Sequence, residues 1–214
     1  MQRYKFSELS LELIESLIDF SEISTGKWRP EALPIRENEQ IIVSYFKERL
    51  QDEQLLLLNE ATVWGKAIYP LLTMVEQNSI SAWAQVPMSA AFKQFVVEGF
   101  VDGVVGTKKT GHLSAPFLVV VEAKKGIEAK EPQYQLYGAM LAAAKQNWNE
   151  KPEEPLIIYG CYTVTDVWVF VRGEASRIND DKPALTIQTS REFVERIEAE
   201  IILGILKAIT AKNE

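Results

Sequence analysis

The sequence contains very little cysteine or histidine. Among its 214 residues are one cysteine, Cys161, and one histidine, His112. A single cysteine excludes an internal disulfide, which makes a reducing cytoplasm the expected location. The chain also cannot build a Cys/His zinc cluster, so any metal must be held mainly by oxygen ligands, which suit Mg²⁺ or Mn²⁺. We assign no role to His112, because a lone loop histidine is usually a surface residue.

Long apolar runs are also missing. No stretch is long enough to span a membrane, and the start M-Q-R-Y-K-F-S-E lacks the apolar core of a signal peptide. We therefore expect no membrane partner. Apolar residues make up 47% of the chain and charged residues 25%, which is typical of a globular protein. The length fits a single domain spanning residues 1–214.

The formal net charge is −7, so positive charge is scarce overall. This argues against a general nucleic-acid coat protein, because binding phosphates needs positive surface. Lysines do gather in one segment, at Lys108, Lys109, Lys124, Lys125 and Lys130. A local positive patch there is one interpretation, and solvated loop lysines are the other.

The most informative stretch is 117–126, which reads F-L-V-V-V-E-A-K-K-G. A continuous apolar run of this length is typical of a strand buried on both faces. Because strand side chains alternate, Glu122 and Lys124 should lie side by side where this strand ends. A buried charge without a partner is costly, so the pattern indicates either a functional site or a half-buried ion pair that closes the strand.

Other segments give the order of elements. Periodicity, caps and turn residues predict helices at 7–23 and 37–52, a loop at 24–35, a helix capped by Asn59 and kinked at Pro70, and a helix opened by Pro132. A capping box of Thr189 and Glu192 should precede the last helix. Strands are predicted at 81–88, 95–105, 117–121, 156–164 and 167–172, with a short edge strand at 184–187.

This order predicts a mixed α/β (α+β) fold, with a central mixed sheet of about five strands flanked by helices. Residues 1–58 would form an N-terminal helical extension, 59–172 the core and 189–212 a C-terminal helix. The predicted inward faces are Ile41, Ile42, Tyr45 and Phe46 on one helix and Phe193, Ile197, Ile201, Ile205 and Ile209 on the last. The apolar terminal helices are also candidates for a homodimer face, although such faces more often pack in a core.

Two further acids occupy unusual positions. Asp102 interrupts a run of Val and Phe, although Asp is depleted in strands; its neighbouring glycines also allow a simple turn. Glu60 follows the cap residue Asn59, where a glutamate often serves only the helix dipole. On adjacent antiparallel strands, Asp102 and Glu122 could meet.

Taken together, these residues resemble the PD-(D/E)XK nuclease superfamily, whose members share the restriction-endonuclease-like fold. The resemblance spans about 59–172 and rests on Glu60, Asp102 in V-D-G, Glu122 and Lys124 in V-V-V-E-A-K, and Gln133 with Tyr137 in Q-x-x-x-Y. Gln135 fits the glutamine position almost as well as Gln133. One departure is Val101, which precedes Asp102 where the family name has proline.

The resemblance implies roles for these residues. Asp102, Glu122 and the Ala123 carbonyl would bind Mg²⁺ or Mn²⁺, and Glu60 would hold a second ion or a metal-bound water. Lys124 would act on the attacking water or on the charge that develops at phosphorus. Gln133 or Gln135 would orient the phosphate.

The expected function is therefore a metal-dependent nuclease, a hydrolase that cleaves the phosphodiester bonds of nucleic acid, with DNA favoured over RNA. The alternative is a catalytically inactive protein of the same fold that acts as a structural or interaction subunit. The acidic net charge and the lack of an obvious basic groove motivate that alternative.

Overall fold

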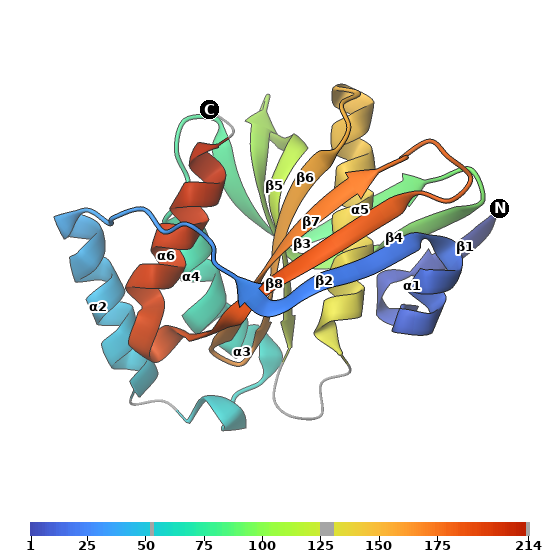
Figure 1. Ribbon diagram of the computed structural model, residues 1–214. Coiled ribbons are helices and arrows are strands. Elements are labelled where there is room, and N and C mark those ends of the chain that lie inside the picture. Colours follow the sequence, from blue (N-terminus) through green and yellow to red (C-terminus); the bar gives the residue numbers. More distant parts are fainter. Residues whose placement is uncertain (52–53, 125–130, 213–214) are drawn as a thin grey trace.

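The computed structural model describes residues 1–51, 54–124 and 131–212. Within them, eight strands form one mixed sheet with helices against both faces (Figure 1). The strands are β1 (Gln2–Lys5), β2 (Asp19–Trp28), β3 (Ile80–Ala91), β4 (Phe95–Lys109), β5 (His112–Lys124), β6 (Leu156–Val164), β7 (Val167–Ser176) and β8 (Ala184–Val194). The mixed α/β class is confirmed, but the sheet is larger than the five or so strands predicted.

The helices form one layer on each face of the sheet. They are α1 (Leu11–Leu17), α2 (Glu37–Gln51), α3 (Glu60–Val63), α4 (Tyr69–Thr73), α5 (Pro132–Glu150) and α6 (Glu195–Ala211), with shorter segments η1 (Phe6–Glu8), η2 (Leu55–Leu57) and the π-helical η3 (Trp64–Ile68). Helices α1 and α5 cover one core, which we call the α5-side core, and α2, α3, α4 and α6 cover the other, the α6-side core. No helix in the described ranges is long and apolar enough to cross a bilayer.

Strand β5 lies inside the sheet, between β4 and β6. It is antiparallel to β4 and parallel to β6, and its side chains alternate between the two cores, with Val120 in the α5-side core and Val121 in the α6-side core. The prediction of a strand buried on both faces is confirmed. The antiparallel pairing expected for the strands that carry Asp102 and Glu122, β4 and β5, is also confirmed.

Several local signals also give the right structure. The Asn59 side chain accepts a hydrogen bond from the backbone N–H of Thr62 at 2.8 Å, as an N-cap should. Pro70 lies in the first turn of α4, and the irregularity predicted there takes the form of a π-helical segment between α3 and α4. Pro132 begins α5, and the Thr165–Asp166 turn joins β6 to β7.

The N-terminal region is only partly predicted: the helix expected at 37–52 is confirmed as α2, but the segments before it differ. Only 11–17 is α-helical within the expected helix 7–23, and the expected loop 24–35 begins inside β2. Strand β2 pairs in parallel with β8 at an edge of the sheet, so its alternation is mostly polar and half-exposed, which gives a weak sequence signal. Strand β1 pairs with β4. Residues 1–58 therefore contribute two strands to the sheet.

The predicted inward faces of α2 and α6 are partly wrong. In α2, Ile41, Ile42 and Tyr45 are exposed, and the buried positions are Glu39, Val43 and Leu50. In α6, Ile197 and Ile201 are exposed while Ile205 and Ile209 are buried. A ladder of four-residue steps drifts by about 40° per step around an α-helix, so its two ends cannot share one face. The homodimer face remains a prediction.

The start of α6 also differs from the expected capping box. Thr189 and Glu192 belong to β8, which continues to Val194, and α6 begins at Glu195. The edge strand predicted at 184–187 is thus the first part of a longer strand. Pairing with both β7 and β2 extends it beyond what its local sequence indicates.

A split in the sheet sets up the candidate site. Strand β3 pairs with one side of β4 over most of its length, whereas β1 and β5 share the other side. The β1 ladder ends at the Lys5–Glu98 pair, and the β5 ladder begins at the Gly103–Val121 pair. Among the described residues, 99–102 therefore have no strand partner on that side.

We predict that Gly204→Ala destabilises the protein by about 1–3 kcal/mol, because a Cβ there would lie 2.5 Å from the backbone oxygen of Leu33. Helix α6 and the segment before α2 approach too closely for a side chain. Gly65→Ala is the matched control, since its Cβ would meet no atom within 4 Å. Urea denaturation measures the free energy of unfolding of both variants. Equal values for Gly204→Ala and Gly65→Ala would contradict this packing.

Candidate functional site

Asp102 closes the split between β4 and β5. Its Oδ2 accepts a hydrogen bond from the backbone N–H of Ala123 at 2.8 Å; Asp102 is one residue beyond the last paired residue of β4 and Ala123 two residues beyond that of β5. The carboxylate thus takes over a backbone donor at the point where the ladder ends. The predicted meeting of Asp102 with the end of β5 is seen here as a contact with the β5 backbone.

The backbone around Asp102 departs from regular strand geometry. Val101 and Val104 both pack in the α5-side core, although residues three apart on a regular strand face opposite sides. Opposite Asp102 on β3, Gln85 has a positive φ of 52°, and its Nε2 donates to Asp102 Oδ1 at 3.0 Å. Both carboxylate oxygens therefore have a fixed protein partner, which sets the direction of the side chain.

Glu122 and Lys124 lie side by side at the exit of β5, as predicted. Lys124 Nζ is 2.5 Å from Glu122 Oε1, and the Glu122 side chain is only 1% exposed whereas that of Lys124 is 23% exposed. Apart from this close contact with the ammonium group, neither oxygen of Glu122 has a hydrogen-bond partner in the described residues. A buried carboxylate with so few partners is energetically costly, so a further cation would stabilise it.

The surroundings of Glu122 oppose its ionisation. Burial raises the pKa of the Glu122 carboxyl to about 8, and the negative charges of Asp102 and Glu60 add to the rise while Lys124 opposes it. For Lys124, burial alone would lower the pKa, but Glu122, Asp102 and Glu60 raise it above its usual value. The site therefore holds a charged lysine beside a carboxyl that loses its proton less readily than an ordinary glutamate.

Glu60 approaches from the other face of the sheet. It begins α3, and the Trp64 ring one turn later packs where a Cβ on Gly103 would stand, at 2.5 Å. This packing brings the helix to the same end of the sheet as the exit of β5 (Figure 1). Glu60 is exposed and near enough to affect the pKa values of both Glu122 and Lys124.

The donor atoms suit a hard divalent cation. Asp102 and Glu122 supply carboxylate oxygens, and Mg²⁺ in proteins is usually held by one or two carboxylates together with waters. The buried Glu122 is the observation that fits such an ion, because its Oε2 has no partner in the described residues and its Oε1 contacts only the Lys124 ammonium group. Across the described ranges, no three Asp, Glu, His or Cys side chains converge as a ready metal cluster, so Glu60 does not complete a three-acid set in this conformation.

The two candidate glutamines take different positions in the first turns of α5. Gln135 and Asp102 both line a hollow of about 700 Å³. Gln133 does not line it, as far as the described part of the chain shows. Tyr137 is buried and packs against Phe20 and Tyr134 in the α5-side core. The geometry therefore favours Gln135 over Gln133 as the glutamine of the site, and it gives Tyr137 a packing role.

The exit of β5 is held by the β6–β7 turn. The backbone N–H of Thr165 donates to the carbonyl of Lys124 at 2.9 Å. The neighbouring Asp166 is buried and bound by Arg196 through two hydrogen bonds, at 2.7 and 2.9 Å. Bidentate pairing of this kind fixes geometry, so the backbone of Lys124 has a rigid support.

The predicted cluster of lysines is not one patch. Lys108 and Lys109 lie at the β4–β5 hairpin, at the opposite end of β5 from Lys124, and Lys109 pairs with Glu150. Lys125 and Lys130 lie outside the described residues. Among the five lysines, the structure therefore places only Lys124 beside the candidate acids.

Two residues near the site could not be identified from the sequence. Gln85 orients Asp102 from an unusual backbone conformation that no local signal predicts. Phe100 reads as a core residue of an apolar strand, yet it is 63% exposed in the hollow beside Asp102. The roles of both residues become visible only when the pairing of β4 with its neighbouring strands is known.

Comparison with known proteins adds no relative: no family model and no curated protein matches the chain. The function of the chain is therefore inferred from its residues and their geometry.

We predict that the free energy of unfolding of Glu122→Gln, measured relative to that of the wild type, increases as the pH rises from 5 to 8. In the folded state the Glu122 pKa is about 8 against an ordinary 4.5, so its stabilising contribution is complete below pH 4.5 and is lost as the pH approaches 8. The neutral amide does not titrate. The gain should be at most about 1.4 kcal/mol per pH unit in this window.

The measurement is urea denaturation of both proteins at pH 5 and pH 8. The matched control is Glu153→Gln, because Glu153 forms an exposed pair with Lys151. A stability difference between Glu122→Gln and wild type that does not change with pH would contradict the raised pKa.

Proposed function

We propose that this protein hydrolyses phosphodiester bonds of nucleic acid with the help of a divalent metal ion, within a restriction-endonuclease-like fold. The observation that carries the proposal is the buried Glu122 carboxyl near Asp102, whose oxygens have no partner in the described residues other than the Lys124 ammonium group. A buried acid of raised pKa with other charged groups beside a hollow is typical of functional sites. The order of Glu60, Asp102, Glu122 and Lys124 along the chain supports the same reading.

Asp102 and Glu122 would hold the ion, with the Ala123 carbonyl as a further oxygen ligand and Glu60 holding a second ion or a water. When bound, Mg²⁺ or Mn²⁺ would neutralise phosphoryl charge and lower the pKa of a water. Glu122 must lose its proton to become a ligand, and nearby positive charge favours that loss.

Lys124 is the charged donor of the site. Its ammonium group lies at the half-buried exit of β5, where it can donate to an attacking water or to the phosphoryl oxygens as their charge increases. Gln135 supplies an amide to the hollow that Asp102 also lines, and this amide would orient the phosphate. DNA is the first substrate to test and RNA the second.

One observation favours a catalytically inactive protein instead. Both oxygens of Asp102 are already engaged by Gln85 and Ala123, and Lys124 lies against Glu122, so the polar groups form a closed arrangement. In such a protein the pair would only close the strand. The two functions differ in metal dependence, because a structural ion pair gains nothing from Mg²⁺.

We predict that the purified protein cuts single- or double-stranded DNA or RNA in Mg²⁺ or Mn²⁺, and that Glu122→Gln, Asp102→Asn and Lys124→Ala each lower the rate by at least about 100-fold. The matched control variants are Glu153→Gln and Lys151→Ala, which alter an exposed ion pair of the same residue types. These should cut at the wild-type rate. Cleavage that is absent from wild type, or equal in wild type and all three site variants, would support the inactive alternative.

A further inference from the structure

The split in the sheet forms an open cleft beside the candidate acids. The cleft has a volume of about 700 Å³ and is lined from five elements, by residues that include Phe6, Pro87, Glu98, Phe100, Asp102 and Gln135. Its floor is the part of β4 at 99–102, which has no strand partner on this side in the described residues. Backbone N–H and C=O groups are therefore available to a ligand there.

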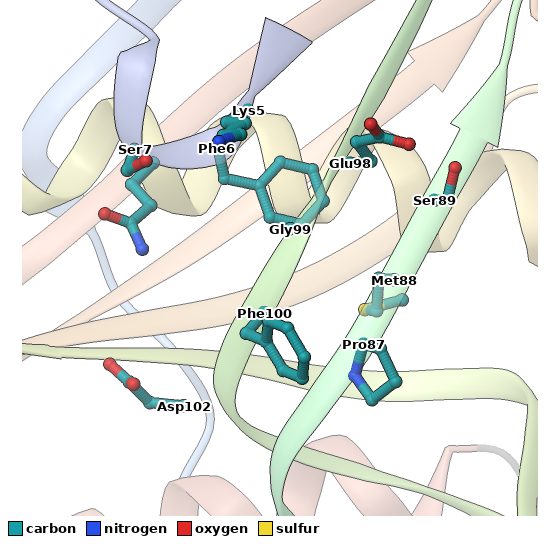
Figure 2. A pocket seen from close by; sticks show the side chains of 11 residues that line it. Lys5, Phe6, Ser7, Pro87, Met88, Ser89, Glu98, Gly99, Phe100 and Asp102 are labelled. Atoms are coloured by element: carbon teal, nitrogen blue, oxygen red, sulfur yellow. The ribbon is translucent and has the colours of Figure 1, made fainter. Parts of the chain in front are cut away.

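Phe100 is the unusual side chain of this cleft. It is 63% exposed, although it belongs to a strand whose other Phe and Val side chains are buried. Figure 2 shows its ring beside Pro87, its cross-strand partner on β3, with Asp102 further along the same strand. Leaving a phenyl ring in water is unfavourable, so a ligand that covers the ring would gain from that contact.

The charges around the ring are already partly balanced. Glu98, at the rim beside Ser89 in Figure 2, forms an ion pair with Arg3 of β1. Lys5, at the end of β1, contributes a positive charge to the cleft, and Asp102 stands at the other end of the unpaired segment. A ligand here meets an exposed aromatic face between a cationic end and the candidate metal-binding end.

We propose that Phe100 stacks on an unpaired nucleobase and thereby directs the site to single-stranded or locally unpaired nucleic acid. This inference rests on the proposed function, because it places the base within reach of the phosphodiester that Asp102, Glu122 and Lys124 would act on. Phe100 is a specificity-determining residue in this account, and it does not take part in the chemical step.

The preference for an unpaired base follows from the geometry of stacking. In a duplex both faces of each base are covered by neighbouring bases, so a ring inside a cleft cannot reach them unless a base leaves the stack. An aromatic ring stacks on any single-stranded base, because every base has a π-face. The cleft is also in the size range of ligand pockets that enclose one small ligand.

The test measures binding without cleavage. Fluorescence anisotropy in Ca²⁺ would compare three labelled ligands, each roughly 12 nucleotides long: a thymidine strand, the same strand with abasic sites at its centre, and a duplex. Phe100→Ala should weaken binding of the thymidine strand about 5- to 100-fold, while Phe100→Trp keeps it. The abasic strand and the duplex should bind equally to wild type and Phe100→Ala.

The matched control is Tyr45→Ala, which removes an exposed aromatic ring from α2 on the other face of the sheet and should leave all three affinities unchanged. The inference is overturned if wild type binds no single strand, or if Phe100→Ala binds the thymidine strand as tightly as wild type. It is also overturned if Phe100→Ala weakens binding of the abasic strand by the same factor as binding of the thymidine strand. Cleavage in Mn²⁺ is scored separately. If wild type binds through Phe100 but never cuts, the proposed hydrolysis fails and the stacking inference stands.

Discussion

The hydrogen bond from the backbone of Ala123 to the Asp102 carboxylate is the constraint on which the candidate site depends. At this point β4 and β5 stop pairing, and an acidic side chain replaces the next backbone acceptor. Because β1 pairs with the same side of β4 only up to Glu98, the sheet stays open between the two ladders. One contact therefore fixes the acid, ends the ladder and bounds the cleft.

The second constraint is the burial of Glu122. A carboxyl that is 1% exposed and has Asp102 and Glu60 nearby is unstable as an anion, and the lysine beside it only partly compensates. Buried acids of this kind are common at ligand sites, because a bound cation offsets the free-energy cost of ionising the buried carboxyl. The rest of the sheet supports the arrangement: β6 pairs with β5 up to Lys124, and the Thr165 turn fixes the last carbonyl.

The sequence alone predicts the centre of this fold better than its edges. The buried run of β5, the cap at Asn59 and the proline at the start of α5 are strong local signals, and each is confirmed. The half-exposed strand β2 carries no comparable signal, since its pairing with β8 is set by tertiary contacts. For the site, alternation correctly joins Glu122 to Lys124, but it cannot show that Asp102 contacts a backbone amide, that Gln85 orients it, or that Phe100 faces a cleft. Those features depend on how three strands meet.

The most direct test of the account is whether a divalent ion displaces the proton of Glu122. NMR titration of the Glu122 side-chain carbon should give a pKa near 8 without metal, and Mg²⁺ should lower it, with protons released to the solution at pH 7. Glu122→Gln should release none. A Glu122 pKa that Mg²⁺ leaves unchanged would contradict the account and leave the pair with Lys124 as a structural feature of the strand end.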